Sequence, residues 1–147
     1  MSETIVTSAE AMMLLGRDYA AKAKGGDVFG LVGTLGTGKT HWTKGFVGLL
    51  DPDATVSSPT FGIVNEYRNG IHTVYHFDFY RLKSRDDLLA LGWDEYLDDG
   101  EIVICEWADM FPDLMPENAI WIEISHRPDG SRSLKTIEKP AVPTTAS

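Results

Sequence analysis

Apolar residues recur every three to four positions near the start of the chain, which is the spacing of one face of a helix. This spacing is followed by Met12, Leu15, Tyr19 and Ala23. Just before them, Thr7 and Glu10 fit a capping box, in which Thr7 caps the helix and Glu10 reaches back. Gly25 and Gly26 favour the end of a helix. The pattern therefore predicts a first helix between Thr7 and Gly25.

Short apolar runs bounded by turn residues predict strands along the rest of the chain. These runs cover residues 28–32, 62–68, 71–80, 101–107, 119–124 and 133–137. The run at 101–107 contains four consecutive apolar residues after its first Glu, which is typical of a strand buried on both faces. Asn69 and Gly70 predict a tight hairpin between two of the runs. Residues 128–130 join the last two.

Two further helices are predicted between these strands. One covers residues 39–50, and the other begins after Ser84 as its cap and ends before Gly92. Alternating strands and helices are typical of an α/β protein. We predict one α/β domain over residues 1–138, with a mostly parallel central sheet, antiparallel hairpin additions and helices on both faces. Residues 139–147, with two prolines, are predicted to be a flexible C-terminal tail.

Composition narrows the function classes. The chain has 147 residues, 43% of them hydrophobic and 24% charged, which suits one globular domain. Its 22 acidic and 13 basic residues give a net charge of −9, which argues against a stand-alone module that binds DNA or RNA directly. The single cysteine, Cys105, excludes an internal disulfide and is expected to be a buried apolar residue. The four histidines show no metal-ligand spacing. With no transmembrane or signal segment apparent, we expect a cytoplasmic protein that is not bound to a membrane.

A phosphate-binding motif lies between the strand at 28–32 and the helix at 39–50. Residues 33–40 read Gly-Thr-Leu-Gly-Thr-Gly-Lys-Thr and match G-x-x-x-x-G-K-[ST], which predicts a P-loop NTPase domain. The turn glycines are Gly33, Gly36 and Gly38. Such a turn points backbone N–H groups at phosphate oxygens, and the following helix N-terminus adds positive charge. Lys39 is expected to contact the β- and γ-phosphates, Thr40 to bind Mg²⁺, and His41 to offer its N–H to the α-phosphate. The alternative is a glycine-rich loop without a ligand.

Two acidic residues at predicted strand ends could complete this site. Glu106 ends the buried run at 102–106 and could hold Mg²⁺ directly or through water. Asp78 lies among aromatic residues and could enter the metal shell or orient the attacking water. The alternatives are a solvated strand-end Glu106 and an outward-facing Asp78.

Other candidates are less specific. The segment Ser-Pro-Thr-Phe at 58–61 presents the Thr60 hydroxyl and could sense the γ-phosphate as a switch, or be a plain turn. Trp42, Trp93 and Trp121 are expected in the core. No arginine is identifiable as one that reaches the γ-phosphate, which predicts a slow enzyme that a partner stimulates.

The sequence also separates classes of P-loop protein. The N-K-x-D segment with which GTPases read guanine is absent after the P-loop, which favours adenine as the base. An S-G-G-Q-like signature, typical of transporter ATPases, is also absent. A kinase lid would need more chain and more arginines than follow the P-loop. We therefore favour a compact ATPase whose ATP cycle drives a conformational change that a partner senses. A small-molecule kinase and a module that binds ATP without hydrolysis are the alternatives.

Several motifs in order resemble one family. They are Leu-Gly-Thr-Gly-Lys-Thr at 35–40, Ser-Pro-Thr-Phe at 58–61, Tyr-His-Phe-Asp-Phe-Tyr-Arg-Leu at 75–82 and Glu-Trp at 106–107. Over roughly residues 5–138 the chain resembles the TsaE (YjeE) family, the P-loop ATPases of bacterial tRNA threonylcarbamoyladenosine biosynthesis. The family usually has Asp where this chain has Thr34, and Ala where it has Thr37.

The resemblance implies a role and a set of site residues. It implies an ATPase that binds ATP or ADP with Mg²⁺ and associates with TsaB and TsaD, which transfer threonylcarbamoyl to the adenosine beside the anticodon of ANN-decoding tRNAs. The tRNA would be contacted indirectly, through that complex. Residues 36–41, including Gly36, Thr37 and Gly38, would bind the phosphates, and Thr40 and Glu106 would bind Mg²⁺. Asp78 matches an essential Asp of the family, and the start of the first helix, near Ala9, would pack against the base.

Overall fold

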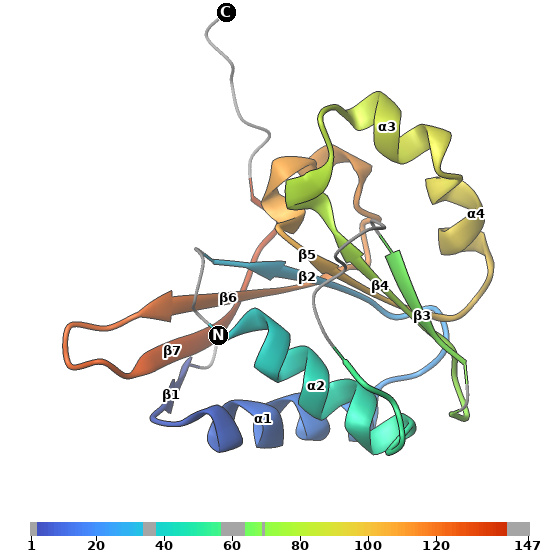
Figure 1. The fold of residues 1–147 in the computed structure, drawn as a ribbon. Helices are drawn as coiled ribbons and strands as arrows, with labels where there is room; N and C mark the ends of the chain where they lie inside the picture. The colour runs from blue at the N-terminus through green and yellow to red at the C-terminus, as the bar shows by residue number, and fades with distance from the viewer. Residues whose placement is uncertain (1–2, 34–37, 57–63, 69, 141–147) are drawn as a thin grey trace, which may run out of the picture.

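A single sheet forms the centre of the molecule (Figure 1). Within residues 3–33, 38–56, 64–68 and 70–140, which the computed structural model describes, seven strands pair in the order β1-β7-β6-β2-β5-β4-β3. The strands are β1 (Glu3–Val6), β2 (Val28–Val32), β3 (Val64–Tyr67), β4 (Val74–Asp78), β5 (Ile102–Glu106), β6 (Ile120–His126) and β7 (Arg132–Ile137).

The middle of the sheet is parallel and its edges are antiparallel. Strand β2 pairs in parallel with β5 on one side and β6 on the other, and β4 pairs in parallel with β5. Strands β3, β7 and β1 add to the two edges in antiparallel fashion. This arrangement confirms the predicted α/β class with a mostly parallel centre and antiparallel hairpins.

Helices cover both faces of the sheet, as predicted. Helices α1 (Ala9–Lys22) and α2 (Lys39–Leu50) lie together on one face, and α3 (Arg85–Ala90) and α4 (Trp93–Asp98) lie on the other (Figure 1). The predicted bounds of α2 and the Ser84 cap of α3 are confirmed. Among the described residues, three short 3-10 helices follow strands or link them: η1 (Phe79–Arg81), η2 (Ala108–Met110) and η3 (Pro112–Leu114).

The core has two layers, one on each side of the sheet. Because successive strand residues point to opposite faces, Ile102 and Ile104 of β5 pack in the layer under α1 and α2, and Val103 and Cys105 pack in the other. Cys105 is fully buried, as expected, and burial raises its pKa well above the ordinary thiol value. The three tryptophans predicted to be core are buried; they are Trp42, Trp93 and Trp121.

The cap predicted for the first helix is wrong by one residue. Ser8, not Thr7, caps α1, because the extended backbone of Ser8 lets its hydroxyl accept a hydrogen bond from the Ala11 N–H at 3.0 Å. The helix accordingly begins at Ala9 and ends at Lys22.

The predicted hairpin forms, because β3 and β4 pair in antiparallel fashion, but its predicted two-residue turn is wrong. Strand β3 ends at Tyr67 and β4 begins at Val74, so six residues, 68–73, connect them; Asn69 lies outside the described residues. A Cβ on Gly70 would lie 2.3 Å from the carbonyl oxygen of Leu50, so the connection packs closely against the end of α2. Packing against the helix thus outweighs the local turn preference.

Strand β4 is shorter than the predicted run at 71–80. The Asp78 side chain accepts a hydrogen bond from the Tyr80 N–H and begins η1, which ends the strand. At the C-terminus, Lys139 donates to the carbonyl oxygen of Met115 at 3.3 Å, and residues 141–147 of the predicted tail lie outside the described residues. In the part of the chain that the structure describes, every helix is too short or too polar to span a bilayer.

Candidate functional site

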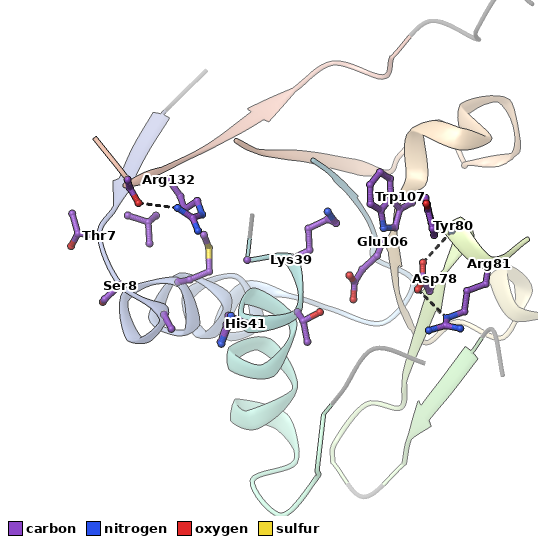
Figure 2. Close-up of a pocket in the computed structure, with 16 residues that line it drawn as sticks. Thr7, Ser8, Lys39, His41, Asp78, Tyr80, Arg81, Glu106, Trp107 and Arg132 are labelled. Carbon is purple, nitrogen blue, oxygen red and sulfur yellow. Dashed lines mark hydrogen bonds and ion pairs between the residues drawn. The ribbon is translucent and has the colours of Figure 1, made fainter. Parts of the chain in front are cut away.

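A cavity of about 830 Å³ opens at the carboxyl end of the parallel strands. Ligands bind at this edge in open α/β sheets. Figure 2 shows Lys39 in the middle, Thr7, Ser8 and Arg132 toward one end, and Asp78, Tyr80 and Trp107 toward the other. The first end is built by the β1–α1 junction and the β6–β7 hairpin, and the second by the ends of β4 and β5.

The last glycine of the phosphate-binding motif has a backbone that favours glycine. Gly38 has a φ of 109° and precedes α2, whose first turn it starts by accepting a hydrogen bond from the Trp42 N–H at 3.0 Å. A Cβ there would lie 3.1 Å from the Cε of Met12. The N-terminus of α2 therefore faces the cavity at Gly38, where any residue with a side chain would strain the backbone. Gly36 and Thr37 lie outside the described residues.

Lys39 is a buried cation at the start of α2. It is 5% exposed, and its Nζ donates to the carbonyl oxygen of Gly33 at 2.6 Å. Its Nζ also lies 4.3 Å from the ring centroid of Trp107. Burial lowers the pKa of Lys39, and three carboxylates oppose this shift: Glu106, Asp109 and Asp78.

Two acids end neighbouring parallel strands beside this lysine. Asp78 of β4 and Glu106 of β5 are register partners, so their side chains point to the same face of the sheet, the one that α1 and α2 cover. Asp78 is 7% exposed and Glu106 is 4% exposed. The alternatives of an outward-facing Asp78 and a solvated Glu106 are therefore wrong.

The two acids have different partners. Glu106 Oε2 lies 2.6 Å from Nε2 of His76, which is fully buried. Asp78 accepts from the Tyr80 N–H at 3.1 Å and pairs with Nε of Arg81 at 3.5 Å (Figure 2). Burial raises the pKa of Asp78; the hydrogen bond from Tyr80 opposes this shift and the charge of Glu106 adds to it.

The structure brings most of the candidates from the sequence into one cavity. Those that line it are Ala9, Gly38, Lys39, Thr40, His41, Asp78 and Glu106. Gly33 is joined to them through its hydrogen bond with Lys39. Thr60 lies outside the described residues, as do Gly36 and Thr37.

Sequence reasoning missed four side chains here. Arg81 and Arg132 both line the cavity, although no arginine had been singled out for it. His76 contacts Glu106, and Trp107 lies between Lys39 and the Tyr80 ring, whose centroid is 4.8 Å from its own. A sequence signal existed for three of them, since His76 and Arg81 flank Asp78 in one motif and Trp107 follows Glu106 in another.

The groups in the cavity fit a magnesium nucleotide. Mg²⁺ prefers oxygen ligands and is usually bound by one or two carboxylates with substrate phosphates. Glu106 and the Thr40 hydroxyl offer such oxygens, and Lys39 and the N-terminus of α2 offer positive charge to phosphates. Among the described residues, no three His, Cys, Asp or Glu side chains are grouped so that they could hold a metal ion.

The family match and the two relatives described here carry the same functional description. The family described as "Threonylcarbamoyl adenosine biosynthesis protein TsaE" matches residues 6–134. A Bacillus subtilis protein named "tRNA threonylcarbamoyladenosine biosynthesis protein TsaE" is 41% identical over 115 residues, which are 78% of this chain and 72% of the relative. A Rickettsia bellii protein of the same name is 32% identical over 132 residues, 89% of this chain and 91% of the relative.

A solved structure agrees with these relatives. The crystal structure of Bacillus subtilis YdiB superposes with a TM-score of 0.78 at 31% sequence identity, covering 95% of this chain and 86% of YdiB. The family match spans most of the chain, and the fold, a parallel-centred sheet with the phosphate-binding motif between β2 and α2, agrees with a P-loop NTPase. The chain belongs to the TsaE family, whose members act in threonylcarbamoyl adenosine biosynthesis.

Proposed function

We propose that the cavity binds ATP with Mg²⁺ and hydrolyses it, in support of threonylcarbamoyl transfer to tRNA adenosine by TsaB and TsaD. One observation carries the proposal. The buried cation Lys39 and the neighbouring Thr40 face two buried acids, Asp78 and Glu106, across one cavity at the carboxyl edge of a parallel sheet.

The residues of the chain suit distinct tasks in hydrolysis. Lys39 would exchange its bond with Gly33 for phosphate oxygens, and its charge would offset negative charge that develops in the transition state. Thr40 and Glu106 would hold Mg²⁺, which when bound supplies neutralising charge to the β- and γ-phosphates. Asp78 would orient the attacking water and accept its proton, a task that a raised carboxyl pKa favours.

The other end of the cavity suits the nucleoside. Arg132 offers a planar cation there (Figure 2), and Ala9 and Met12 of α1 add apolar lining. We expect adenine at this end, because the chain lacks the segment with which GTPases read guanine.

The place in tRNA modification is carried over from the named relatives. With a net charge of −9, this chain is poorly suited to hold a tRNA phosphate backbone by itself. The tRNA would therefore be held by the TsaB–TsaD complex, with this protein acting on that complex in the cytoplasm.

The proposal is tested by measuring phosphate release from ATP with Mg²⁺, for the protein alone and with TsaB and TsaD. We expect slow release alone and faster release with both partners. Binding of ATP without phosphate release under either condition would instead support a binding module. Transfer of labelled phosphate to a nucleoside or sugar would support a small-molecule kinase.

A further inference from the structure

His76 contacts the carboxylate of Glu106 inside the protein. It occupies the middle of β4, its side chain is fully buried, and its Nε2 lies 2.6 Å from Oε2 of Glu106. The two residues are thirty positions apart in the chain and meet because β4 and β5 are adjacent parallel strands. The contact is thus a product of the sheet register.

The contact specifies where the imidazole proton lies. Among the described residues, Nδ1 of His76 has no hydrogen-bond partner, and it is buried. A buried N–H without an acceptor is costly, whereas a bare ring nitrogen loses less. The arrangement is therefore satisfied when an Nε2 proton is donated to Glu106. The ring is further held by the Tyr67 ring, which stacks on it with centroids 6.3 Å apart.

We propose that His76 is a positioning residue for Glu106, fixing its carboxylate so that Oε1 is presented to Mg²⁺. This inference rests on the proposed function. A glutamate side chain has three rotatable bonds, and a hydrogen bond from a rigid, buried ring to one oxygen restricts them while leaving the other oxygen for the metal. Partners of this kind behind a metal ligand are typically worth about 10–100-fold in metal affinity.

The test separates positioning from packing by the choice of variant. His76→Gln keeps an amide N–H₂ at nearly the reach of Nε2, whereas His76→Met has similar length and no donor. His76→Asn keeps a donor but sets it closer to the backbone, out of reach of Glu106. His72→Gln is the matched control, because His72 pairs with Glu101 at 3.9 Å and does not line the cavity.

The readout is the Mg²⁺ concentration at half-maximal binding of a fluorescent, non-hydrolysable ATP analogue, with thermal melting to confirm folding. We expect His76→Met and His76→Asn to raise this concentration at least ~10-fold. His76→Gln should recover most of the loss, and His72→Gln should match the wild type. Binding of the analogue without Mg²⁺ should be unchanged, since the phosphate cradle is intact. In a Glu106→Gln background, His76→Met should add no further shift.

Several results would overturn the inference. One is a wild-type Mg²⁺ requirement in folded His76→Met or, should that variant not fold, in His76→Asn. Another is a His76→Gln protein as impaired as His76→Met, which would indicate packing alone. A shift that persists without Glu106 would also count against it. If the wild type shows no Mg²⁺-dependent nucleotide binding, the proposed function fails and this inference fails with it.

Discussion

Asp78 and Glu106 are register partners at the ends of β4 and β5, and both are buried on the same face of the sheet. The charge of Glu106 raises the pKa of Asp78, so the two carboxylates repel each other when both are ionised, and neither is left in purely apolar surroundings. Each instead has its own support: His76 for Glu106, and the Tyr80 N–H with Arg81 for Asp78. The two acids thus have different hydrogen-bond and ion-pair partners. This difference suits the two tasks that we propose, Glu106 on the metal and Asp78 on water.

Replacing Lys39 by Ala should nearly abolish hydrolysis. Its Nζ donates to the loop carbonyl of Gly33 and feels the charges of Glu106 and Asp78, so we expect its charge to act on the phosphates where negative charge develops. Removing one such donor typically costs ~10²–10³-fold in rate, and we expect a loss of at least ~10²-fold here. Lys44→Ala, on the exposed side of the same helix, is the control and should retain activity. Normal turnover by a folded Lys39→Ala protein would contradict the assignment.

Thr40→Val should raise the Mg²⁺ requirement, whereas Thr40→Ser should not. Valine is nearly isosteric with threonine but lacks the hydroxyl oxygen that Mg²⁺ would bind, and serine keeps it. Phosphate release measured across a Mg²⁺ titration gives the comparison. If valine and serine give the same midpoint, Thr40 is not a metal ligand.

The first turn of α2 and the buried strand β5 show what the sequence predicts well. The bounds Lys39–Leu50 and the double-sided burial of β5 follow from local signals, a glycine-lysine turn and an unbroken apolar run. Lys39, Asp78 and Glu106 line one cavity because the carboxyl ends of the parallel strands β2, β4 and β5 share one edge.

Long-range packing accounts for what the sequence does not predict. Strand β1 has only four residues, three of them exposed, and exists through its pairing with β7. Arg132 lines the cavity because β7 pairs with β1, which sets Arg132 opposite Val6 just before α1, and His76 meets Glu106 through the register of β4 and β5. No local pattern contains these pairings, so residues whose roles depend on them are visible only in the fold.

Asp78→Asn should stabilise the protein at neutral pH. Burial raises the pKa of Asp78, so the native state keeps this proton to a higher pH than the unfolded chain does. The free energy of unfolding therefore falls as pH rises from the unfolded pKa through the native one, and stays lower above it. Asparagine removes this titration and keeps an oxygen to accept from Tyr80.

Thermal melting of both proteins across pH provides the measurement. The Asn variant should melt at a higher temperature at neutral pH, and the difference should shrink toward the ordinary carboxyl pKa of about 3.9. A wild type that is the more stable protein at neutral pH would show that the Arg81 ion pair outweighs burial.

Two glycines let α1 and α2 touch through their backbones. A Cβ on Gly16 would lie 2.0 Å from the carbonyl oxygen of Trp42, and one on Gly45 would lie 1.9 Å from that of Met13. Gly16→Ala or Gly45→Ala must push the helices apart, and we expect a loss of at least ~1–3 kcal/mol in the free energy of unfolding. Gly48→Ala is the control on the same helix, with no described atom within 4 Å, and should gain ~0.5–1 kcal/mol. Denaturant unfolding of the three variants tests the difference, which vanishes if the helices are not in backbone contact.

Hydrolysis of ATP should be slow for the protein alone and faster with TsaB and TsaD. Arg81 lines the cavity but is paired with Asp78, so this arginine is held on the protein's own carboxylate in the structure described here. An arginine or an ordered switch that reaches the γ-phosphate can raise the rate of a P-loop enzyme by ~10³–10⁵-fold. We therefore expect slow hydrolysis alone and clear stimulation by both partners, which we predict to contact the protein at or near residues 58–61.

Asp78→Ala separates binding from stimulated chemistry. Lys39 keeps its hydrogen bond to the Gly33 carbonyl and Gly38 still begins α2 when the Asp78 carboxylate is removed, so we expect the variant to bind ATP with near wild-type affinity. It should lose the stimulated rate, because its proposed work is to orient water and accept a proton. Arg85→Ala, whose guanidinium pairs with Asp113 away from the cavity, is the control and should keep both properties. Equilibrium nucleotide binding and phosphate release, each with and without TsaB–TsaD, make the comparison. If the partners still stimulate the Asp78→Ala protein fully, Asp78 has no role in the stimulated reaction. If the isolated wild type releases phosphate fast and the partners do not change its rate, the partners do not control hydrolysis.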